Sequence, residues 1–154
     1  MQNLIIILLW SFLCGVAYRL GGVGKPFDTK FRDIGCAFIS LITIWSFGIS
    51  VELGWTVLYL LCVFGTMTTC WEYWKTDDIE WFEWCLTGFF YGLSALPICL
   101  STGRYLGLII RTIILTIFMP FSNKLQFKVI WDKTDGVEFS RGFMFNITIP
   151  LLLL

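Results

Sequence analysis

Long apolar segments separated by short polar ones run along the whole chain. The predominantly apolar segments cover residues 4–18, 34–51, 53–70, 84–100, 105–121 and 138–154. A typical segment of about 18 residues forms a helix about 27 Å long, close to the ~30 Å hydrocarbon core of a bilayer. The pattern therefore predicts an all-α, polytopic bundle of about six short transmembrane helices. The last segment is short and charged at its start, so a five-span version stays open.

The charged residues gather on one side of this predicted bundle. Threading the six crossings places three connections on the same face, namely residues 19–33, 71–83 and 122–137. Arg141, at the start of the last span, lies on that face too. All basic residues except Arg104 and Arg111, and all acidic residues except Glu52, are then gathered there. Because basic loops are retained in the cytoplasm, this face is predicted to be cytoplasmic, with the N- and C-termini outside.

The composition agrees with a membrane location. Hydrophobic residues make up 57% of the 154 positions and charged residues only 14%, about half the charge of an ordinary soluble domain. A small soluble domain keeps much of its chain at the surface, so it could not hide this much apolar area. The net charge is zero, and no nucleic-acid partner is expected. The chain is predicted to be a multi-pass protein of the cell membrane, with lipids as its partners.

The residue types present restrict the chemistry of any site. The chain has no histidine, which excludes Ser-His-Asp and Cys-His catalytic arrangements and removes the commonest ligand of transition metals. Its six cysteines lie in or beside apolar segments without C-x-x-C spacing, as is typical of small packing residues with free thiols. We therefore expect no cofactor and no metal site, and we favour a binding protein over an enzyme.

One candidate ligand-binding segment follows the first predicted span. Arg19 ends that span, and a glycine-rich turn leads from it to Lys25. The backbone N–H groups of such a turn, together with two cations, suit an anionic headgroup. A nucleotide-binding P-loop is not predicted, because that motif requires glycine in place of Arg19 and serine or threonine in place of Pro26.

Two further charged pairs lie at the same predicted face. Arg32 and Asp33 adjoin at the start of the second span. Glu138 and Arg141 are three residues apart and share one face of a helix. Charges at membrane depth are costly unless they are paired or hydrated, and they tend to mark functional interiors. We expect Arg19, Lys25, Arg32 and Arg141 to bind an anion. Asp33 and Glu138 are expected to orient the arginines. The alternative of purely local ion pairs stays open.

A separate charge lies inside the fifth predicted span. Arg111 is about one and a half turns from the start of that span, and Glu52 is the only acidic residue predicted on the same side. Pairing of Arg111, or of Arg104, with Glu52 would offset the cost of burying the charge. We predict a structural ion pair between Glu52 and Arg111, with a role in an ion or substrate path as the alternative.

Two short motifs near the chain ends carry a family resemblance. They are Tyr18-Arg19-Leu20-Gly21-Gly22 after the first span and Glu138-x-x-Arg141-Gly142 at the start of the last. With these motifs the two ends of the chain resemble small uncharacterised multi-span membrane proteins encoded by tailed bacteriophages. The resemblance implies the inner membrane of a bacterial host and no particular activity. It also implies that Arg19, Glu138 and Arg141 belong together in space.

Three functional hypotheses follow from these residues. The leading one is a non-enzymatic protein that binds or conducts an anionic ligand, such as a lipid headgroup, at its cytoplasmic mouth and acts on the host envelope. The second is an enzyme acting on a lipid phosphate or a polyprenyl carrier, which needs carboxylates around a metal ion, with residues 77–80 as the candidates. The third is a pore-forming oligomer. Gly88 and Gly92 permit close helix approach within the chain or between copies, so a homo-oligomer stays open.

Overall fold

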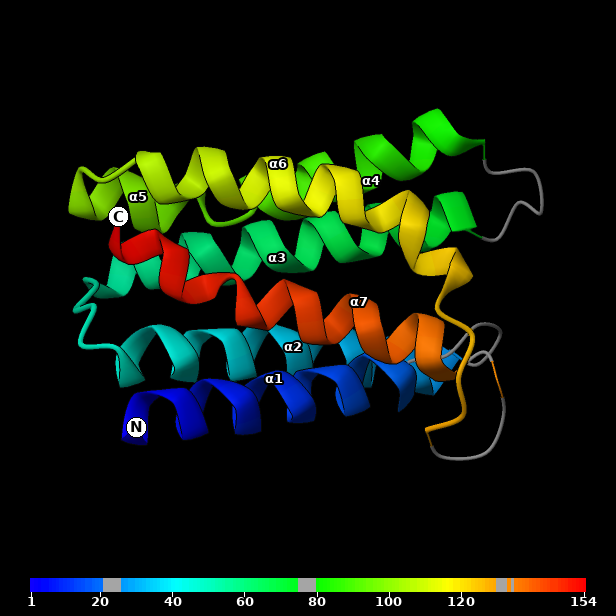
Figure 1. Ribbon diagram of the computed structural model, residues 1–154. Coiled ribbons are helices and arrows are strands. Elements are labelled where there is room, and N and C mark those ends of the chain that lie inside the picture. The colour runs from blue at the N-terminus through cyan, green and yellow to red at the C-terminus, as the bar shows by residue number, and fades with distance from the viewer. Residues whose placement is uncertain (21–25, 75–79, 130–132, 134) are drawn as a thin grey trace.

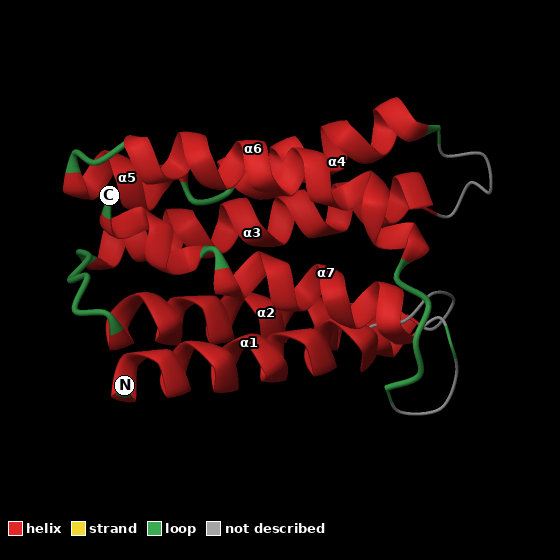
Figure 2. Ribbon diagram, viewed as in Figure 1, coloured by secondary structure: helices red, strands yellow, loops and turns green. Residues whose placement is uncertain are grey.

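A computed structural model describes residues 1–20, 26–74, 80–129, 133 and 135–154. Helices make up the regular structure of these residues, and no strand occurs among them (Figure 2), which confirms the predicted all-α class. In chain order the helices are α1 (Gln2–Leu20), α2 (Pro26–Ser46), α3 (Leu53–Trp74), α4 (Trp81–Leu93), α5 (Leu96–Thr102), α6 (Leu106–Phe121), η1 (Ser122–Lys124), α7 (Asp135–Ile147) and η2 (Ile149–Leu153).

The second helix is longer at its start than the apolar pattern indicated. The predicted span covered residues 34–51, whereas α2 begins at Pro26. Proline suits the first turn of a helix, because the N–H it lacks has no partner there. Shortly after α2 ends, Gly48 adopts a left-handed backbone with φ of 76°, a conformation that glycine reaches without strain. Arg32 and Asp33 therefore lie inside α2 and not at its start.

Two of the predicted spans are interrupted in the middle. Residues 84–100 divide into α4 and α5, and the last span divides into α7 and η2. Each second piece has a proline in its first turn, Pro97 in α5 and Pro150 in η2. Proline cannot donate the hydrogen bond that would continue the preceding helix. Both breaks therefore leave the last carbonyl groups of a helix inside the bundle, where they need other donors.

Among the described residues, four segments are long and apolar enough to cross a membrane. They are Gln2–Leu20, Leu53–Cys70, Trp81–Thr102 and Leu106–Lys124. The first half of α2 is charged, and α7 is both short and charged. The helices are thus compatible with a membrane-embedded protein, while a count of six spans stays a prediction.

Large apolar side chains cover much of the outer surface, and many polar side chains are buried beside an apolar core. On α1, for example, Ile5, Leu9 and Phe12 are each half-exposed or more. The buried polar and charged set includes Ser11, Arg32, Asp33, Ser40, Thr43, Arg111, Asp135, Arg141, Asn146 and Thr148. In lipid, apolar side chains gain nothing by turning inward, whereas polar groups must find partners inside the protein. The observed distribution is the one that a lipid environment favours.

The helices run side by side along one common direction (Figure 1). The most extensive contacts join α1 with α7, α4 with α6, and α1 with α2. The N- and C-terminal residues lie at the same end of the bundle (Figure 1). The opposite end holds the last turn of α1, the first turn of α7 and the end of α6. We call this opposite end, which carries Arg19, Arg32, Asp135 and Arg141, the charged end.

Glycines allow the two closest helix pairs to touch along their backbones. A Cβ atom at Gly88 or Gly92 of α4 would collide with the backbone of α6 at Leu115 or Thr112. The spacing of these two glycines therefore serves packing within the chain. On α7, a Cβ at Gly142 would come within 2.5 Å of the Cys14 carbonyl oxygen in α1.

Replacing Gly142 with alanine is expected to destabilise the protein, because the added methyl group would push α7 away from α1. Overpacking of this kind costs about 1–3 kcal/mol. Thermal unfolding in detergent micelles, followed by tryptophan fluorescence, should show a melting temperature several degrees lower. Gly65→Ala on α3 is the matched control, since nothing lies within 4 Å of a Cβ there. Equal melting temperatures for the two variants would contradict close contact at Gly142.

Candidate functional site

An ion pair between the first and last helices lies at the charged end. Arg19, in the last turn of α1, donates from Nε to Oδ1 of Asp135, in the first turn of α7. The Asp135 side chain is fully buried. A carboxylate in the first turn of a helix is also favoured by the positive end of the helix dipole. The pair joins α1 to α7, and sequence reasoning had assigned Arg19 a role without identifying Asp135.

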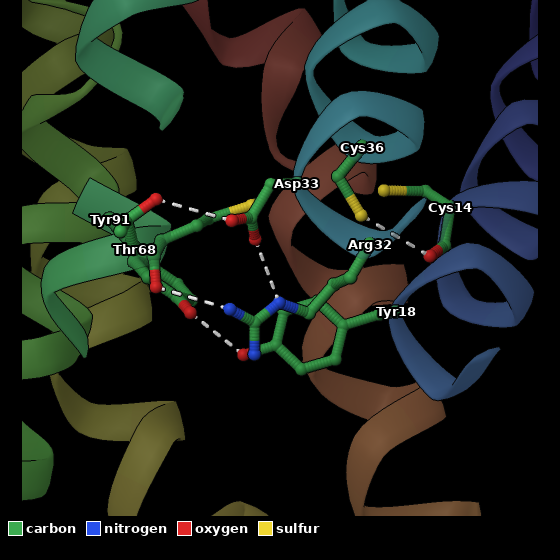
Figure 3. A network of polar contacts seen from close by, with 8 residues as sticks. Cys14, Tyr18, Arg32, Asp33, Cys36, Thr68 and Tyr91 are labelled. Carbon is green, nitrogen blue, oxygen red and sulfur yellow. Dashed lines mark hydrogen bonds and ion pairs between the residues drawn. The ribbon is translucent and has the colours of Figure 1, made fainter. Parts of the chain in front are cut away.

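A second ion pair lies within α2 and is hydrogen-bonded to α3 (Figure 3). Arg32 Nε donates to Asp33 Oδ1 at 3.0 Å, and Arg32 Nη2 donates to the Met67 carbonyl at 3.1 Å. Thr68 Oγ1 donates to the other oxygen of Asp33 at 3.2 Å. Arg32 and Asp33 are both buried. Arg32 and Asp33 therefore form the local ion pair that was the alternative for these neighbours, and their other contacts fix them to α3.

Tyr18 lies where the charged segments meet. Its ring centre is 5.3 Å from the Arg32 guanidinium carbon (Figure 3), a cation–π distance. Its hydroxyl oxygen is 2.7 Å from that of Tyr91 on α4, so α1, α2 and α4 are linked. Gly142 of α7, the neighbour of Arg141, packs against Tyr18, since a Cβ atom at Gly142 would come within 2.5 Å of the Tyr18 Cβ. Three of the predicted segments thus come together around one buried tyrosine.

Arg141 is held by groups at the end of α6 and on α4. Its Nε donates to Ser122 Oγ at 2.9 Å, and its Nη2 donates to Asn123 Oδ1 at 2.5 Å. The guanidinium carbon lies 4.2 Å from the ring centre of Trp84. These contacts fix the direction of the guanidinium.

Most of the predicted anion-binding residues lie together at one end of the bundle. Arg19, Arg32 and Arg141 all lie at the charged end, as does half-buried Glu138, one turn before Arg141 on α7. Lys25 lies outside the described residues. Sequence reasoning missed Tyr91, Ser122, Asn123 and Asp135. Their only signal was that single polar groups stood in or beside apolar helices.

A second polar centre lies around Arg111, deeper in the bundle. Arg111 is fully buried. Its Nη1 donates to the carbonyls of Tyr91 at 3.0 Å and Gly92 at 2.8 Å, and its Nη2 donates to the Phe145 carbonyl at 3.1 Å. Its Nε donates to Thr148 Oγ1 at 3.1 Å. The acceptors lie where α4 and α7 are interrupted, so Arg111 satisfies carbonyl groups at two helix ends.

The predicted partner of Arg111 is elsewhere. Glu52 is exposed in the connection before α3, and the structure does not bring it to Arg111. Helix C-termini carry partial negative charge, which stabilises a nearby cation. Two such ends, those of α4 and α7, therefore take the place that sequence reasoning gave to a carboxylate. Nothing in the pattern of charges could have indicated this, because the compensating groups are backbone carbonyls.

The described part of the chain offers no group of three or more histidine, cysteine or acidic side chains that could hold a metal ion. Asp77 and Asp78 of the acidic segment lie outside that part. Comparison of the chain with protein-family models, with curated proteins and with solved structures finds no match.

Replacing Arg111 with methionine is expected to destabilise the protein by about 3 kcal/mol or more, because several buried acceptors lose their donor while the volume is kept. Arg111→Lys should fall between methionine and the wild type, since one ammonium cannot reach all the acceptors at once. Thermal unfolding in detergent micelles measures both effects.

Arg104→Met is the matched control for this prediction. Arg104 is exposed and donates to a single carbonyl, that of Leu153 at 2.7 Å. Its replacement should change the melting temperature little. If Arg111→Met were no less stable than Arg104→Met, the interrupted helices would not depend on the buried guanidinium.

Proposed function

We propose that this chain is a multi-pass membrane protein that binds an anionic, phosphate-like ligand at the charged end of its bundle. One observation carries the proposal. Arg19, Arg32 and Arg141 come from three different helices and all lie at the charged end, where Arg32 contacts the ring of buried Tyr18. Ionisable residues in or beside transmembrane helices are costly, and a concentration of them indicates a function.

The chemistry of the basic residues suits phosphate. A guanidinium group presents a planar fork of donors that matches two phosphate oxygens. Ser122, Asn123 and Trp84 orient the guanidinium of Arg141 before any ligand arrives, and preorganisation of this kind lowers the entropic cost of binding. Asn123 and Lys124 are exposed beside it, which makes this rim reachable from the membrane–water interface.

The proposal includes a topology of six crossings, with the charged end in the cytoplasm of a bacterial cell and both termini outside. In this topology α2 and α7 also cross, with their charged first halves at the cytoplasmic rim. The position of the N- and C-terminal residues at one end of the bundle (Figure 1) supports an even number of crossings. The basic residues at the opposite end support the orientation. A phage-encoded protein acting on the host envelope would have this placement.

Reporter fusions test the topology. Green fluorescent protein should fluoresce when it is fused within residues 19–33 or 122–137, because it folds there in the cytoplasm. Alkaline phosphatase should be active when it is fused at residues 48–52 or 103–105, because it requires the oxidising periplasm. Opposite compartments for residues 19–33 and 122–137 would separate the basic residues and rule out a shared site.

Ligand binding is tested with two probes, phosphatidylglycerol in detergent micelles and inorganic phosphate in the same buffer. We expect at least one of them to raise the melting temperature of the wild-type protein. Arg141→Gln should abolish that increase, because the oriented guanidinium is lost. Arg141→Lys should weaken it, because a lysine retains the charge without the planar fork.

Each shift is measured against the melting temperature of the same variant without ligand, so that a loss of stability is not mistaken for a loss of binding. Arg104→Gln, at the opposite end of the bundle, is the control and should respond to the ligand like the wild type. Full retention of the ligand-induced shift in Arg141→Gln would refute the proposed function.

A further inference from the structure

An apolar groove runs along the outer face of the bundle between α4 and α6. It encloses about 410 Å³, which lies within the usual range of ligand sites. Phe89 and Leu93 of α4 form one wall, and Ile109, Ile113 and Ile117 belong to the other. The groove exists because glycines next to this wall bring the two backbones together, while the larger side chains stand on either side.

The groove is centred on the middle of α6, around Ile113. From Ile113 to Lys124 the chain rises about 16 Å, close to the ~15 Å of half the hydrocarbon core. Ile113 and Ile117 are four residues apart, and Phe121 is four residues further on, so the three share one face of the helix. Their line leads from the middle of the bundle to the charged end.

A cation marks the end of this line. Lys124, in η1, places its Nζ atom 5.4 Å from the ring centre of Phe121. Its side chain is exposed, so the ammonium group can contact a headgroup in the interface. Asn123, the adjacent residue, accepts the hydrogen bond from Arg141. Phe121 and Lys124 therefore continue the face of α6 that lines the groove as far as the rim of the proposed anion site.

We infer that the groove holds an acyl chain of an anionic phospholipid whose phosphate lies at Lys124, beside Asn123. The inference rests on the proposed function and deepens it, because it identifies the anionic ligand as a lipid and not a soluble phosphate. The apolar walls match a hydrocarbon chain, the distance from Lys124 to the middle of the groove matches one leaflet, and the cation matches the phosphate.

The acyl-chain seat is tested by filling the groove. Ile113 lies at the lip of the groove and is 54% exposed, so the larger side chain of Ile113→Trp fills the groove without disturbing the core. Leu9→Trp on α1 is the matched control, since Leu9 is 53% exposed and lies outside the groove. Native mass spectrometry is performed with phosphatidylglycerol and phosphatidylethanolamine of identical chains. Ile113→Trp should retain about tenfold less of both lipids, and Leu9→Trp should retain them like the wild type.

The headgroup contact is tested by removing one charge. Lys124→Gln should reduce the preference for phosphatidylglycerol over phosphatidylethanolamine about fivefold, the effect expected of one basic residue near an anionic lipid. Lys128→Gln is the control. Lys128 follows Phe127, whose carbonyl accepts a hydrogen bond from Gly136 of α7, so it lies away from the groove. Its replacement should leave the lipid preference unchanged.

The outcomes separate this inference from the function on which it rests. If Arg141→Gln loses phosphatidylglycerol while Ile113→Trp retains it, the groove seat is overturned and the anion site stands. If Ile113→Trp loses both lipids while Arg141→Gln keeps the preference, the proposed anion site fails instead. Binding of glycerol phosphate as tight as that of the lipid would make the acyl chain unnecessary. A change of Ile113→Trp from dimer to monomer would assign the groove to a second copy of the chain.

Discussion

The bundle depends on one buried arginine that compensates for two interrupted helices. Proline residues end α4 and α7 in the middle of the protein, which leaves carbonyl groups that water cannot reach. Arg111 donates to the carbonyls of both helices and to Thr148. The charge of the arginine is costly by itself, and so are the carbonyls. Each cost is offset by the other, so neither feature is stable without its partner.

The same contacts connect the middle of the bundle with its charged end. The carbonyl of Tyr91 accepts a hydrogen bond from Arg111, while the hydroxyl of Tyr91 lies 2.7 Å from that of Tyr18. Tyr18 in turn lies against Arg32. Because Tyr91 takes part in both centres, a displacement of α4 at its interruption would also move the group that positions Tyr18. The charged end therefore owes part of its geometry to the break in α4.

The all-α class and the concentration of charge at one end of the bundle could be predicted from the sequence. The groups that stabilise each buried charge could not. Apolar segments of membrane length indicate helices because lipid permits few other structures, and the basic residues indicated one end of the bundle. Glu52 was a reasonable partner for Arg111 as long as only side chains were considered. Backbone carbonyls carry no sequence signal. Those freed by a break at Pro97 or Pro150 need a donor from the protein only once the helices have packed and water cannot reach them.

The three arginines of the charged end differ in what they contact, and this difference bears on the proposed function. Arg19 and Arg32 form ion pairs that join α1 to α7 and fix α2 to α3. A ligand that competed for these pairs would loosen the helices that carry the site. Arg141 is directed by the hydroxyl of Ser122, the amide of Asn123 and the indole ring of Trp84. Asn123 and Lys124 are exposed, so the proposed ligand would reach this rim first, and the ion pairs of Arg19 and Arg32 hold the helices that carry it.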